Sequence, residues 1–484
     1  MKKRENKVEK KASISRDSKI KEFKETLKNF WGEFKQVRYG IVGLVLLIIF
    51  ILMMVLEPYI IPFTEAGERW SDITYWIDNP RSAAPVWSNW FTSKKSTVHE
   101  FLTDPEIVVT ETPQFQVLET EFNYNYKYDI PPGELTLKAR GKGDVVVEAE
   151  IVRPDGETIN LVRRNFSSRN ETEIRIALGN EASTRIINFG REYESTENSR
   201  GIQRHQMKPM EILFSKAEEG VLVNPEPLKG EYKINLKVIV LGKDSYFQDP
   251  EIVVSGRIFG LLGTDDAKRD IWSGIVVGTK WAIFIGLLTA FVSIAVGIIY
   301  GVTMAYFGGW LDSLMMRIYE IFVSIPMLPV LVVFSAVFSP SLWILILFMC
   351  VFYWTGPVLT VRSMALQIKE ETYIEAAHAL NASTGRIIFK HMIPQLIPYA
   401  FANMALSVPG AIVAEASISL LGLGDASVVT WGQILHGAMK SSAVLKGLWW
   451  WVVPPGLMIA LLGMTFAFLG FSMDKILNPK LKTR

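Results

Sequence analysis

Residues 371–398 read ETYIEAAHALNASTGRIIFKHMIPQLIP and lie between two strongly apolar segments of the chain. This stretch carries too many polar and charged side chains to lie in lipid, whereas its apolar residues recur at helical spacing. We therefore expect two short helices with a break between them. A short helix–turn–helix held at a membrane surface has a suitable shape for docking into a groove on a partner protein.

The break between the two expected helices falls near Asn381, because asparagine is second only to glycine in ending a helix in the left-handed conformation. One face of the first helix collects the residues at helical spacing, namely Ile374, Ala377, and Leu380 or Asn381. Ser383 is then expected to cap the second helix. That helix carries three residues ahead of Pro394, namely Ile387, Ile388 and His391.

The composition of the chain indicates a membrane protein. Of its 484 residues 49% are hydrophobic, and these concentrate in uncharged runs long enough to cross about 30 Å of hydrocarbon. The formal net charge of +2 favours no nucleic-acid partner. Cys350 is the only cysteine, which excludes a disulfide within the chain. We find no metal-ligand spacing and no catalytic triad, and we interpret His99 and His205 as structural or surface residues.

Six apolar runs are expected to span the membrane, at residues 39–56, 281–307, 315–338, 342–361, 397–423 and 448–473. Small residues in the second run should allow close approach of neighbouring helices, namely Gly286, Gly297 and Gly301. Gly308 and Gly309 predict a tight turn after that run. The third run contains Glu320 and two prolines.

Residues 64–255 have a different character, with charges of both signs and alternating apolar and polar residues. VVVEAEIV at 145–152 and ETINLV at 157–162 flank Arg-Pro-Asp-Gly, which predicts a hairpin. GEYKINLKVIVLG at 230–242 is similar to the closing strands of immunoglobulin-like sandwiches, so we predict a β-rich, sandwich-like domain. Four tryptophans at its start could belong to the core or to the bilayer interface: Trp70, Trp76, Trp87 and Trp90.

The first 38 residues are polar and rich in Lys and Arg, interspersed with Glu. The positive-inside rule places this segment in the cytosol, and counting spans then places residues 64–270 outside and residues 371–393 inside. Basic residues that flank the later spans fall on the same inner side, among them Arg362, Lys369 and Arg386. We therefore predict a multi-pass protein of the plasma membrane with both termini in the cytoplasm.

The polar stretch resembles the EAA loop of ABC-importer permeases, in which Glu-Ala-Ala is followed by three residues, a glycine and, about ten residues later, Leu-Pro. The matching positions are Glu375, Ala376, Ala377, Asn381 in place of the usual glycine, Ile393 in place of leucine, and Pro394. Asparagine tolerates the same backbone region as glycine, so we expect the turn to be kept. These residues are candidates for contact with an ATPase.

Other stretches resemble the same family. Residues 263–270, GTDDAKRD, are similar to the stretch before the second span, where Thr264 or Asp265 should cap a short helix that lays Ile271 and Trp272 on the membrane. Residues 415–424, EASISLLGLG, followed by a Trp-Gly pair at 431–432, are similar to the EASLSFLGLG…WG signature of these permeases. Asn-Pro-Lys-Leu at 478–481 is similar to their terminal motif.

The resemblance is closest to the second permease of oligopeptide and dipeptide importers. It implies a mainly α membrane protein with six transmembrane helices of the type I ABC-importer permease fold. A large extracytoplasmic β-rich domain is inserted between helices 1 and 2. The implied parts are a cytosolic basic segment (1–38), transmembrane helix 1 (39–63), the extracytoplasmic domain (64–255), and a permease core (256–484) with helices 2–6 and a coupling loop at 371–394.

The resemblance also implies partners, namely a second homologous permease in a heterodimer, two ATPase subunits, an extracytoplasmic substrate-binding protein and membrane lipid. The sequence contains no Gly-x-x-x-x-Gly-Lys-Ser/Thr, so we expect a non-catalytic subunit without a cofactor, with ATP and Mg bound by the ATPases. Their closure around ATP would push the loop and tilt the fourth and fifth spans. Glu375 would pair with the ATPase, or only cap or solvate its own helix.

Carboxylates within membranes usually face a bundle interior or a cavity. Glu320 and Glu415 are therefore either pathway residues or helix-end residues at the interface. Pro409 and Gly410 would bend the fifth span or only loosen its packing. The candidates for the pathway or its gating are Glu320, Pro409, Gly410, Glu415, Ser417 and Ser419.

Three alternatives stay open from the sequence. The same architecture could import another solute, such as an oligosaccharide or nickel. A membrane-anchored sensor or structural protein would need only one span, and five further runs follow the first. A secondary transporter working without ATP would show inverted repeats and broken helices at the midplane, which we do not find.

Overall fold

The computed structural model describes residues 25, 28–195, 202–338 and 341–477. The chain divides into two compact units. The helical unit comprises Met1–Ser71, Ser273–Ser442 and Val452–Arg484, and the β unit comprises Asp72–Trp272 and Ala443–Trp451. Most of the basic tail and the motif at 478–481 lie outside the described residues.

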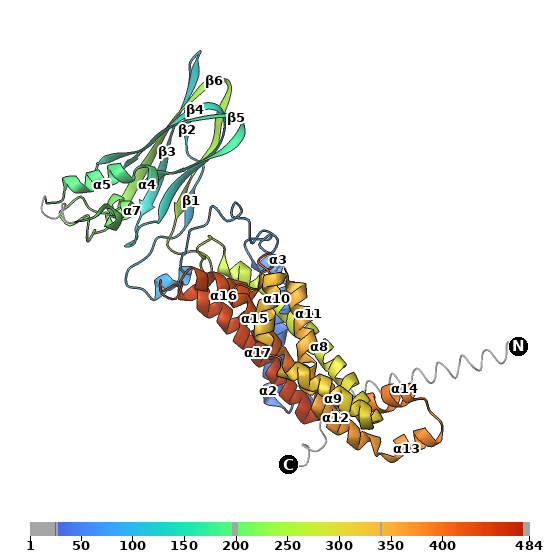
Figure 1. Ribbon diagram of the computed structural model, residues 1–484. Coiled ribbons are helices and arrows are strands. Elements are labelled where there is room, and N and C mark those ends of the chain that lie inside the picture. The colour runs from blue at the N-terminus through green and yellow to red at the C-terminus, as the bar shows by residue number, and fades with distance from the viewer. Residues whose placement is uncertain (1–24, 26–27, 196–201, 339–340, 478–484) are drawn as a thin grey trace, which may run out of the picture. The chain divides into compact units, whose positions relative to one another are not determined.

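The helical unit is built from apolar helices joined by short turns (Figure 1). Its helices are α2 (Arg38–Val55), α3 (Glu57–Ile60), α8 (Ile271–Phe307), α9 (Gly309–Ser324), α10 (Met327–Val337), α11 (Leu342–Tyr353), α12 (Thr355–Lys369), α13 (Thr372–Ala379), α14 (Thr384–Arg386), the π-helix η3 (Ile387–Met392), α15 (Ile393–Leu420), α16 (Trp431–Lys440) and α17 (Trp449–Leu477).

Several helical stretches among the described residues are long and apolar enough to cross a membrane. Five pass this test as continuous spans, at Arg38–Val55, Ile271–Phe307, Leu342–Lys369, Thr384–Leu420 and Trp449–Leu477. The helices α9 and α10 would form a sixth, but they are bent by 72° at the break between them. The unit is therefore helical and multi-spanning.

The bend between α9 and α10 corrects the expectation of one continuous span at 315–338. Ile325 and Pro326 at the break have extended backbone, with ψ angles of 119° and 112°. Proline disfavours helical conformation in the residue before it and cannot donate a backbone hydrogen bond. Pro326 therefore ends α9, and a second helix starts after it in a new direction.

Close helix packing around α8 confirms the role predicted for its glycines. A Cβ on Gly286 would lie 2.7 Å from Val408 of α15, and one on Gly301 would lie 2.8 Å from the carbonyl oxygen of Val358 in α12. The predicted turn after α8 is also confirmed, since Gly308 and Gly309 both have positive φ. These contacts hold α8, α12 and α15 together at short range.

The start of α8 differs from the prediction of a short helix capped by Thr264 or Asp265. No separate helix forms there, and α8 begins directly at Ile271. The Asp265 carboxylate instead accepts hydrogen bonds from the backbone nitrogens of Ala267 at 2.9 Å and Arg269 at 2.8 Å, closing a loop within the β unit. Ile271 is buried, so it does not face a membrane as expected.

Among its described residues, the β unit contains six strands and a few short helices. The strands are β1 (Glu100–Leu102), β2 (Ile107–Glu111), β3 (Phe115–Tyr126), β4 (Glu134–Val152), β5 (Thr158–Ala177) and β6 (Gly230–Ser255). The helices are η1 (Val86–Trp90), α4 (Leu178–Glu181), α5 (Ser183–Glu192), η2 (Arg204–Gln206) and α7 (Pro209–Leu213). The predicted hairpin is confirmed, since Val152 pairs with Thr158 and Gly156 in the turn has a φ of 90°.

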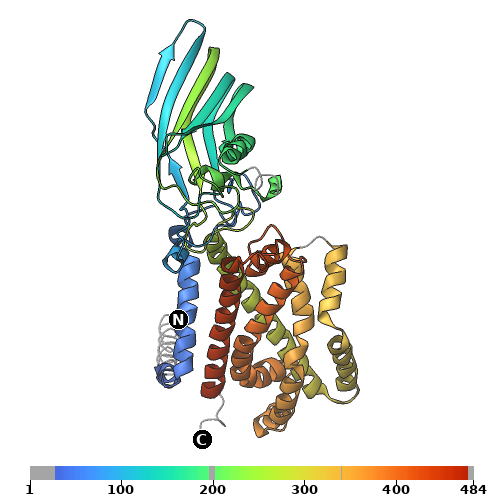
Figure 2. The same ribbon diagram turned by 90° about the vertical axis from the view of Figure 1, so that its left-hand side faces the viewer.

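The strands of the β unit form one antiparallel sheet in the order β2-β3-β6-β4-β5, with β1 beside β6 (Figure 2 shows them side by side). This corrects the expectation of an immunoglobulin-like sandwich, which needs two sheets. The central strands are long, and their pairing is irregular in several places, including a level near Gly143 of β4 and residues 168–172 and 242–246 of the neighbouring strands. Leu137 and Val147 lie on opposite sides of this level. Both belong to one hydrophobic core, which also contains residues of α5 and α7. One apolar face of the single sheet is therefore buried.

The four tryptophans differ in their burial. Trp70 and Trp76 are buried, whereas Trp90 is 79% exposed. Trp87 donates from its indole nitrogen to the carbonyl oxygen of Leu261 at 2.8 Å. Burial of Trp70 and Trp76 therefore makes these two core residues, each within its own unit.

His99 predicts a pH dependence of the β unit. Its ring packs edge-on against Phe101 and Phe259, and burial lowers its pKa from the ordinary 6.5 to about 4. Because the pKa is depressed in the folded state, the neutral ring stabilises the fold fully above pH 6.5, and this stability is lost as pH falls from 6.5 towards 4.

The expected result is faster hydrogen–deuterium exchange of residues 97–102 and 252–258 at pH 5 than at pH 7.5 in the intact protein, after correction for intrinsic rates. Replacing His99 with Phe, which keeps the ring contacts and cannot be protonated, should remove this difference. An equal pH dependence in both proteins would show that another group is responsible.

Candidate functional site

The turn predicted at Asn381 forms as a Schellman motif at the end of α13. Asn381 has a φ of 58°, in the left-handed region. The backbone nitrogen of Ala382 donates to the carbonyl oxygen of Ala377 at 3.0 Å, and that of Asn381 donates to His378 at 2.9 Å. These two bonds satisfy carbonyl groups that the end of a helix leaves free. Asparagine therefore adopts here the left-handed conformation that glycine most often supplies at the end of a helix.

The inner face of this segment is packed into the helical unit. Ile374 and Ala377 of α13 are buried, together with Ile387, Ile388 and Met392 of η3. The same cluster includes residues of α8, α12 and α15, namely Ile294, Ile298, Val302, Ala305, Val361, Ala365 and Leu396. Ala377 is thus part of the chain's own core, and a displacement of α13 would be transmitted to three long helices.

The outer face of the segment is solvent-exposed and mixes charged with apolar residues. Glu375, Ala376 and Asn381 are exposed, and Leu380 is 84% exposed. This placement corrects the expectation that Leu380 shares the buried face, because the Schellman turn redirects the chain one residue after Ala379. Further along, Phe389 is also exposed. The outer face therefore offers both an exposed leucine and an exposed carboxylate.

The second half of the segment differs from the short, capped helix that was predicted. Ser383 stands at the N-cap position, but its side chain makes no capping hydrogen bond. The helix does not end before Pro394 and continues through η3 into α15. Ile393 is half-buried and Pro394 is exposed at the start of α15. Because proline has no N–H, the regular hydrogen-bond pattern of the helix is interrupted at this point. The π-helix η3 precedes it, and such helices usually occur as a single irregular turn within an α-helix.

An ion pair that we did not predict joins α12 to α9. Arg362 donates from its Nε to Asp312 at 2.8 Å and from a terminal nitrogen to the other carboxylate oxygen at 2.5 Å. Asp312 lies in the first turn of α9, and Lys369 at the end of α12 reaches the carbonyl oxygen of Ala305. The only signal in the sequence was a pair of opposite charges within apolar surroundings.

The candidate pathway residues lie in different environments. Glu320 is exposed on α9 and pairs with Arg317 at 2.6 Å. Pro409 and Gly410 lie within α15, which is helical throughout, and a Cβ on Gly410 would meet no atom within 4 Å. Ser417 is half-buried and donates to the carbonyl oxygen of Val413.

Glu415 and Ser419 lie together where α15 packs against α16. Glu415 is buried and accepts a hydrogen bond from the Ser419 hydroxyl at 2.8 Å. The Thr430 side chain interacts with the same carboxyl and caps α16 by accepting from the backbone nitrogen of Gln433. A carboxylate beside a helix N-terminus is favourable. The arrangement holds α16 against α15.

Two neighbours of this buried cluster come from the motif recognised in the sequence. A Cβ on Gly432 would lie 2.8 Å from the Cα of Ala416, so only glycine allows this approach of α16 to α15. The indole nitrogen of Trp431 donates to the carbonyl oxygen of Ile275 in α8 at 2.9 Å. Sequence reasoning identified this motif, but not its contact with α8.

No group of three or more His, Cys, Asp or Glu side chains is placed to hold a metal ion in the part of the chain that the structure describes.

Two parts of the chain match known protein families. Residues 293–483 match the binding-protein-dependent transport system inner membrane component model, and residues 26–82 match the N-terminal transmembrane domain of oligopeptide transport permease C. The dipeptide transport system permease protein DppC of Bacillus subtilis is 35% identical over 222 residues, which cover 46% of this chain and 69% of that protein.

Two oligopeptide permeases are similar to nearly the same extent. The oligopeptide transport system permease protein OppC of Bacillus subtilis is 33% identical, covering 46% of this chain and 72% of that protein. The OppC protein of Haemophilus influenzae is 30% identical, covering 46% and 71%. The chain therefore belongs to the family of binding-protein-dependent inner membrane transport components, as an ABC-importer permease of the oligopeptide and dipeptide permease family. Such a subunit is a non-catalytic translocation component.

The left-handed turn makes a specific prediction. Asn381→Gly should keep full transport activity, because glycine adopts positive φ without steric cost. Asn381→Val should raise the free energy of the turn by about 1–2 kcal/mol, which lowers the equilibrium constant for forming the turn roughly tenfold. ATP-dependent uptake by the reconstituted transporter should fall accordingly for valine only. Equal uptake by both variants would mean that the turn does not matter for transport.

Proposed function

We propose that this chain is the second permease of an ATP-driven importer for oligopeptides or dipeptides, and that it forms half of the translocation pathway. Support comes from the segment at 371–394, whose inner face is packed against α8, α12 and α15 while its outer face is free for a partner. The printed names of the relatives support a peptide substrate. Six spans and an extracytoplasmic β-rich domain between the first and second are part of this proposal.

The proposed parts keep the boundaries expected from the sequence: a cytosolic segment at 1–38, the first transmembrane helix at 39–63, the extracytoplasmic domain at 64–255 and the permease core at 256–484. Both termini lie in the cytoplasm of a cell whose plasma membrane holds the protein. Its partners are a homologous permease, two ATPase subunits that bind ATP and Mg, and an extracytoplasmic binding protein. The inserted domain contacts the binding protein or the outer loops of the partner permease.

The mechanism follows from how the segment is attached. Closure of the ATPase subunits around ATP pushes on the outer face, where Glu375, Ala376 and Leu380 are exposed. The buried face passes the displacement to α12 and α15, because protein cores are close-packed and move as units. The Arg362–Asp312 pair carries α9 along with α12. ATP supplies energy through its preference for the closed arrangement.

In this mechanism, the candidates within the membrane have distinct roles. Pro409 and Gly410 loosen α15 where it bends between its two states, and Glu320 and Ser417 border the pathway. Glu415 and Ser419 keep α16 fixed to α15, so that the two helices move together.

Site-specific cross-linking tests this proposal. A single cysteine is introduced by Ala376→Cys in a Cys350→Ala background, and native membranes are treated with a short bifunctional reagent. We expect a product that contains an ATPase subunit, formed only when the cytosolic face is accessible. Val223→Cys, on an exposed residue of the β unit, serves as the control and should be labelled only from outside. Labelling of residue 376 from outside would refute the proposed topology.

A different solute is the remaining alternative within the same architecture. Oligosaccharide or nickel import would use the same coupling segment, and ligand binding by the partner receptor would distinguish these solutes from peptides. An ion-gradient-driven uptake without ATP in vesicles would instead favour a secondary transporter.

A further inference from the structure

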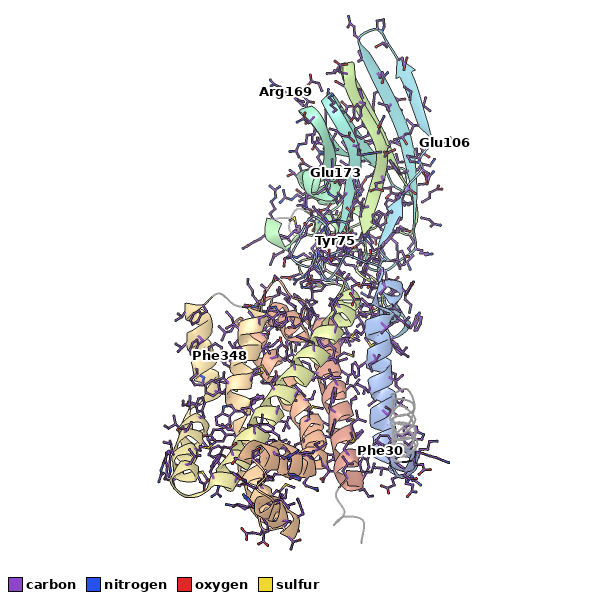
Figure 3. All side chains as sticks on the ribbon, turned by 90° about the vertical axis from the view of Figure 1, so that its right-hand side faces the viewer. Phe30, Tyr75, Glu106, Arg169, Glu173 and Phe348 are labelled. Carbon is purple, nitrogen blue, oxygen red and sulfur yellow. The ribbon has the colours of Figure 1, made fainter. Side chains whose placement is uncertain are left out.

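The two edges of the sheet in the β unit differ sharply. β5 forms one edge, and its exposed residues are polar or charged, as Arg169 and Glu173 show in Figure 3. Charges and irregular pairing are the usual means by which proteins keep an edge strand from pairing with other chains. β5 has both, since its pairing with β4 shifts register twice. This edge is therefore protected.

β2 forms the opposite edge and lacks this protection over its centre. Among the described residues it pairs only with β3. Its residues Ile107, Val108 and Val109 are 43%, 63% and 50% exposed. Successive strand residues point to opposite faces of a sheet, so apolar side chains are uncovered on both faces. An open, apolar edge strand is a template for an added strand.

Acidic residues surround this open edge. Glu106 and Glu111 flank the apolar residues of β2, and Figure 3 shows Glu106 at this side of the sheet. A groove of about 660 Å³ runs from β2 across the neighbouring strands. Its charged lining consists of five glutamates and one lysine, namely Glu106, Glu119, Glu121, Glu148, Glu150 and Lys237.

Part of this acidic charge is already neutralised within the sheet. Lys237 pairs with Glu119, Lys233 with Glu121, and Arg163 with Glu148. Glu106, Glu111 and Glu150 form no ion pair among the described residues, and Glu150 instead accepts a hydrogen bond from Asn235. The uncompensated carboxylates therefore lie at the edge itself and beside it, where a cationic chain would meet them.

A second copy of this chain fits the edge poorly. Antiparallel pairing of two β2 strands centred on Val108 and Val109 would place Glu106 of each copy opposite Glu111 of the other. Like charges directly opposite each other destabilise a strand pair. The edge therefore favours a different chain, one that carries lysine or arginine opposite Glu106 and Glu111.

We propose that the β2 edge binds an extended, lysine- or arginine-bearing oligopeptide substrate, which adds to the sheet as a further strand. Such pairing recognises the peptide backbone and needs no particular side-chain sequence, which suits an importer of varied peptides. The flanking glutamates then favour cationic peptides. This inference rests on the proposed function, because it takes a peptide to be the transported solute.

Direct binding to the full-length protein in detergent tests this inference without transport. The probe is a fluorescein-labelled Lys-Val-Thr-Val-Lys peptide, read by fluorescence anisotropy, with Glu-Val-Thr-Val-Glu as the comparison. We expect the cationic probe to bind at least tenfold more tightly. A version with N-methylated backbone nitrogens should not bind, since it cannot form strand hydrogen bonds.

Variants of β2 test whether the peptide probe binds at this strand. Val108→Lys introduces a charge into the open edge and should weaken the cationic probe at least tenfold, whereas Val223→Lys, at a residue 68% exposed elsewhere in the β unit, should leave it unchanged. Glu106→Lys combined with Glu111→Lys should reverse the preference, so that the anionic probe binds more tightly. Equal binding of both probes by all variants would overturn the proposal.

The result is separable from the proposed import function. Loss of probe binding in Val108→Lys with continued ATP-driven uptake would support an accessory peptide site and leave the importer intact. Absence of peptide binding, together with loss of the co-purifying binding protein in Val108→Lys, would show that the edge contacts a protein and would refute the peptide site. Import of a non-peptide solute would refute the proposed substrate, whatever the probe does.

Discussion

Replacing Leu380 with aspartate is expected to abolish ATP-driven uptake while the permease remains folded. Leu380 is 84% exposed at the tip of the coupling segment, so it contributes little to the core of its own chain. In the proposed complex it becomes an apolar anchor on the ATPase, and a charge there would remain buried without a partner. Loss of one such anchor costs about 2 kcal/mol or more, which weakens ATPase association about 30-fold.

The measurement is co-purification of the ATPase subunits together with ATP-dependent uptake in proteoliposomes. Leu445→Asp is the matched control, because Leu445 is 89% exposed but belongs to the other unit. This control should retain both activities. Normal uptake by Leu380→Asp would exclude the outer face of the segment as the ATPase contact.

Replacing Gly432 with alanine is expected to lower both the thermal stability and the transport activity of the complex. The new Cβ would lie 2.7 Å from the Cβ of Ser419 and 2.8 Å from the Cα of Ala416. Because the Ala416 atom belongs to the backbone of α15, the conflict is relieved only if α16 moves away. Such overpacking costs about 1–3 kcal/mol. The separation would also disturb the Glu415, Ser419 and Thr430 cluster.

Thermal unfolding of the purified complex, followed by intrinsic tryptophan fluorescence, measures the first effect, and uptake measures the second. Gly456→Ala in α17 is the control, since a Cβ there would meet no atom within 4 Å. This variant should be as stable as the parent protein or slightly more stable, because alanine is the better helix former. Unchanged stability of Gly432→Ala would show that α15 and α16 need not stay in close contact.

Much of the fold could be predicted because its signals are local in the chain. Long apolar runs indicate where the apolar helices lie, although α8 begins at Ile271, well before the predicted run at 281–307, and Arg-Pro-Asp-Gly between alternating strands identifies the β4–β5 hairpin. The turn at Asn381 could be predicted for the same reason, because asparagine tolerates the backbone conformation that the turn requires. Pro326 could also be read from the sequence. The prediction of one straight span did not take into account that proline disfavours a helical conformation in the residue before it, here Ile325.

The candidate site was predictable only in part. The Glu-Ala-Ala residues located the segment, but which of them face outward depends on the packing of α13 against α8 and α12. This packing buries Ala377 and leaves Glu375 and Leu380 exposed. The Arg362–Asp312 pair was missed because its two residues are far apart in the sequence.

Apolar runs, turns and the stretch polar enough to meet a partner could be predicted from the sequence, because each depends on neighbouring residues and their periodicity. The tertiary structure decided which residues touch across the chain. It joined the long strands into one sheet with an open edge at β2, and it buried Glu415 between α15 and α16. These contacts depend on how distant segments fill shared space, which no local pattern of residues records.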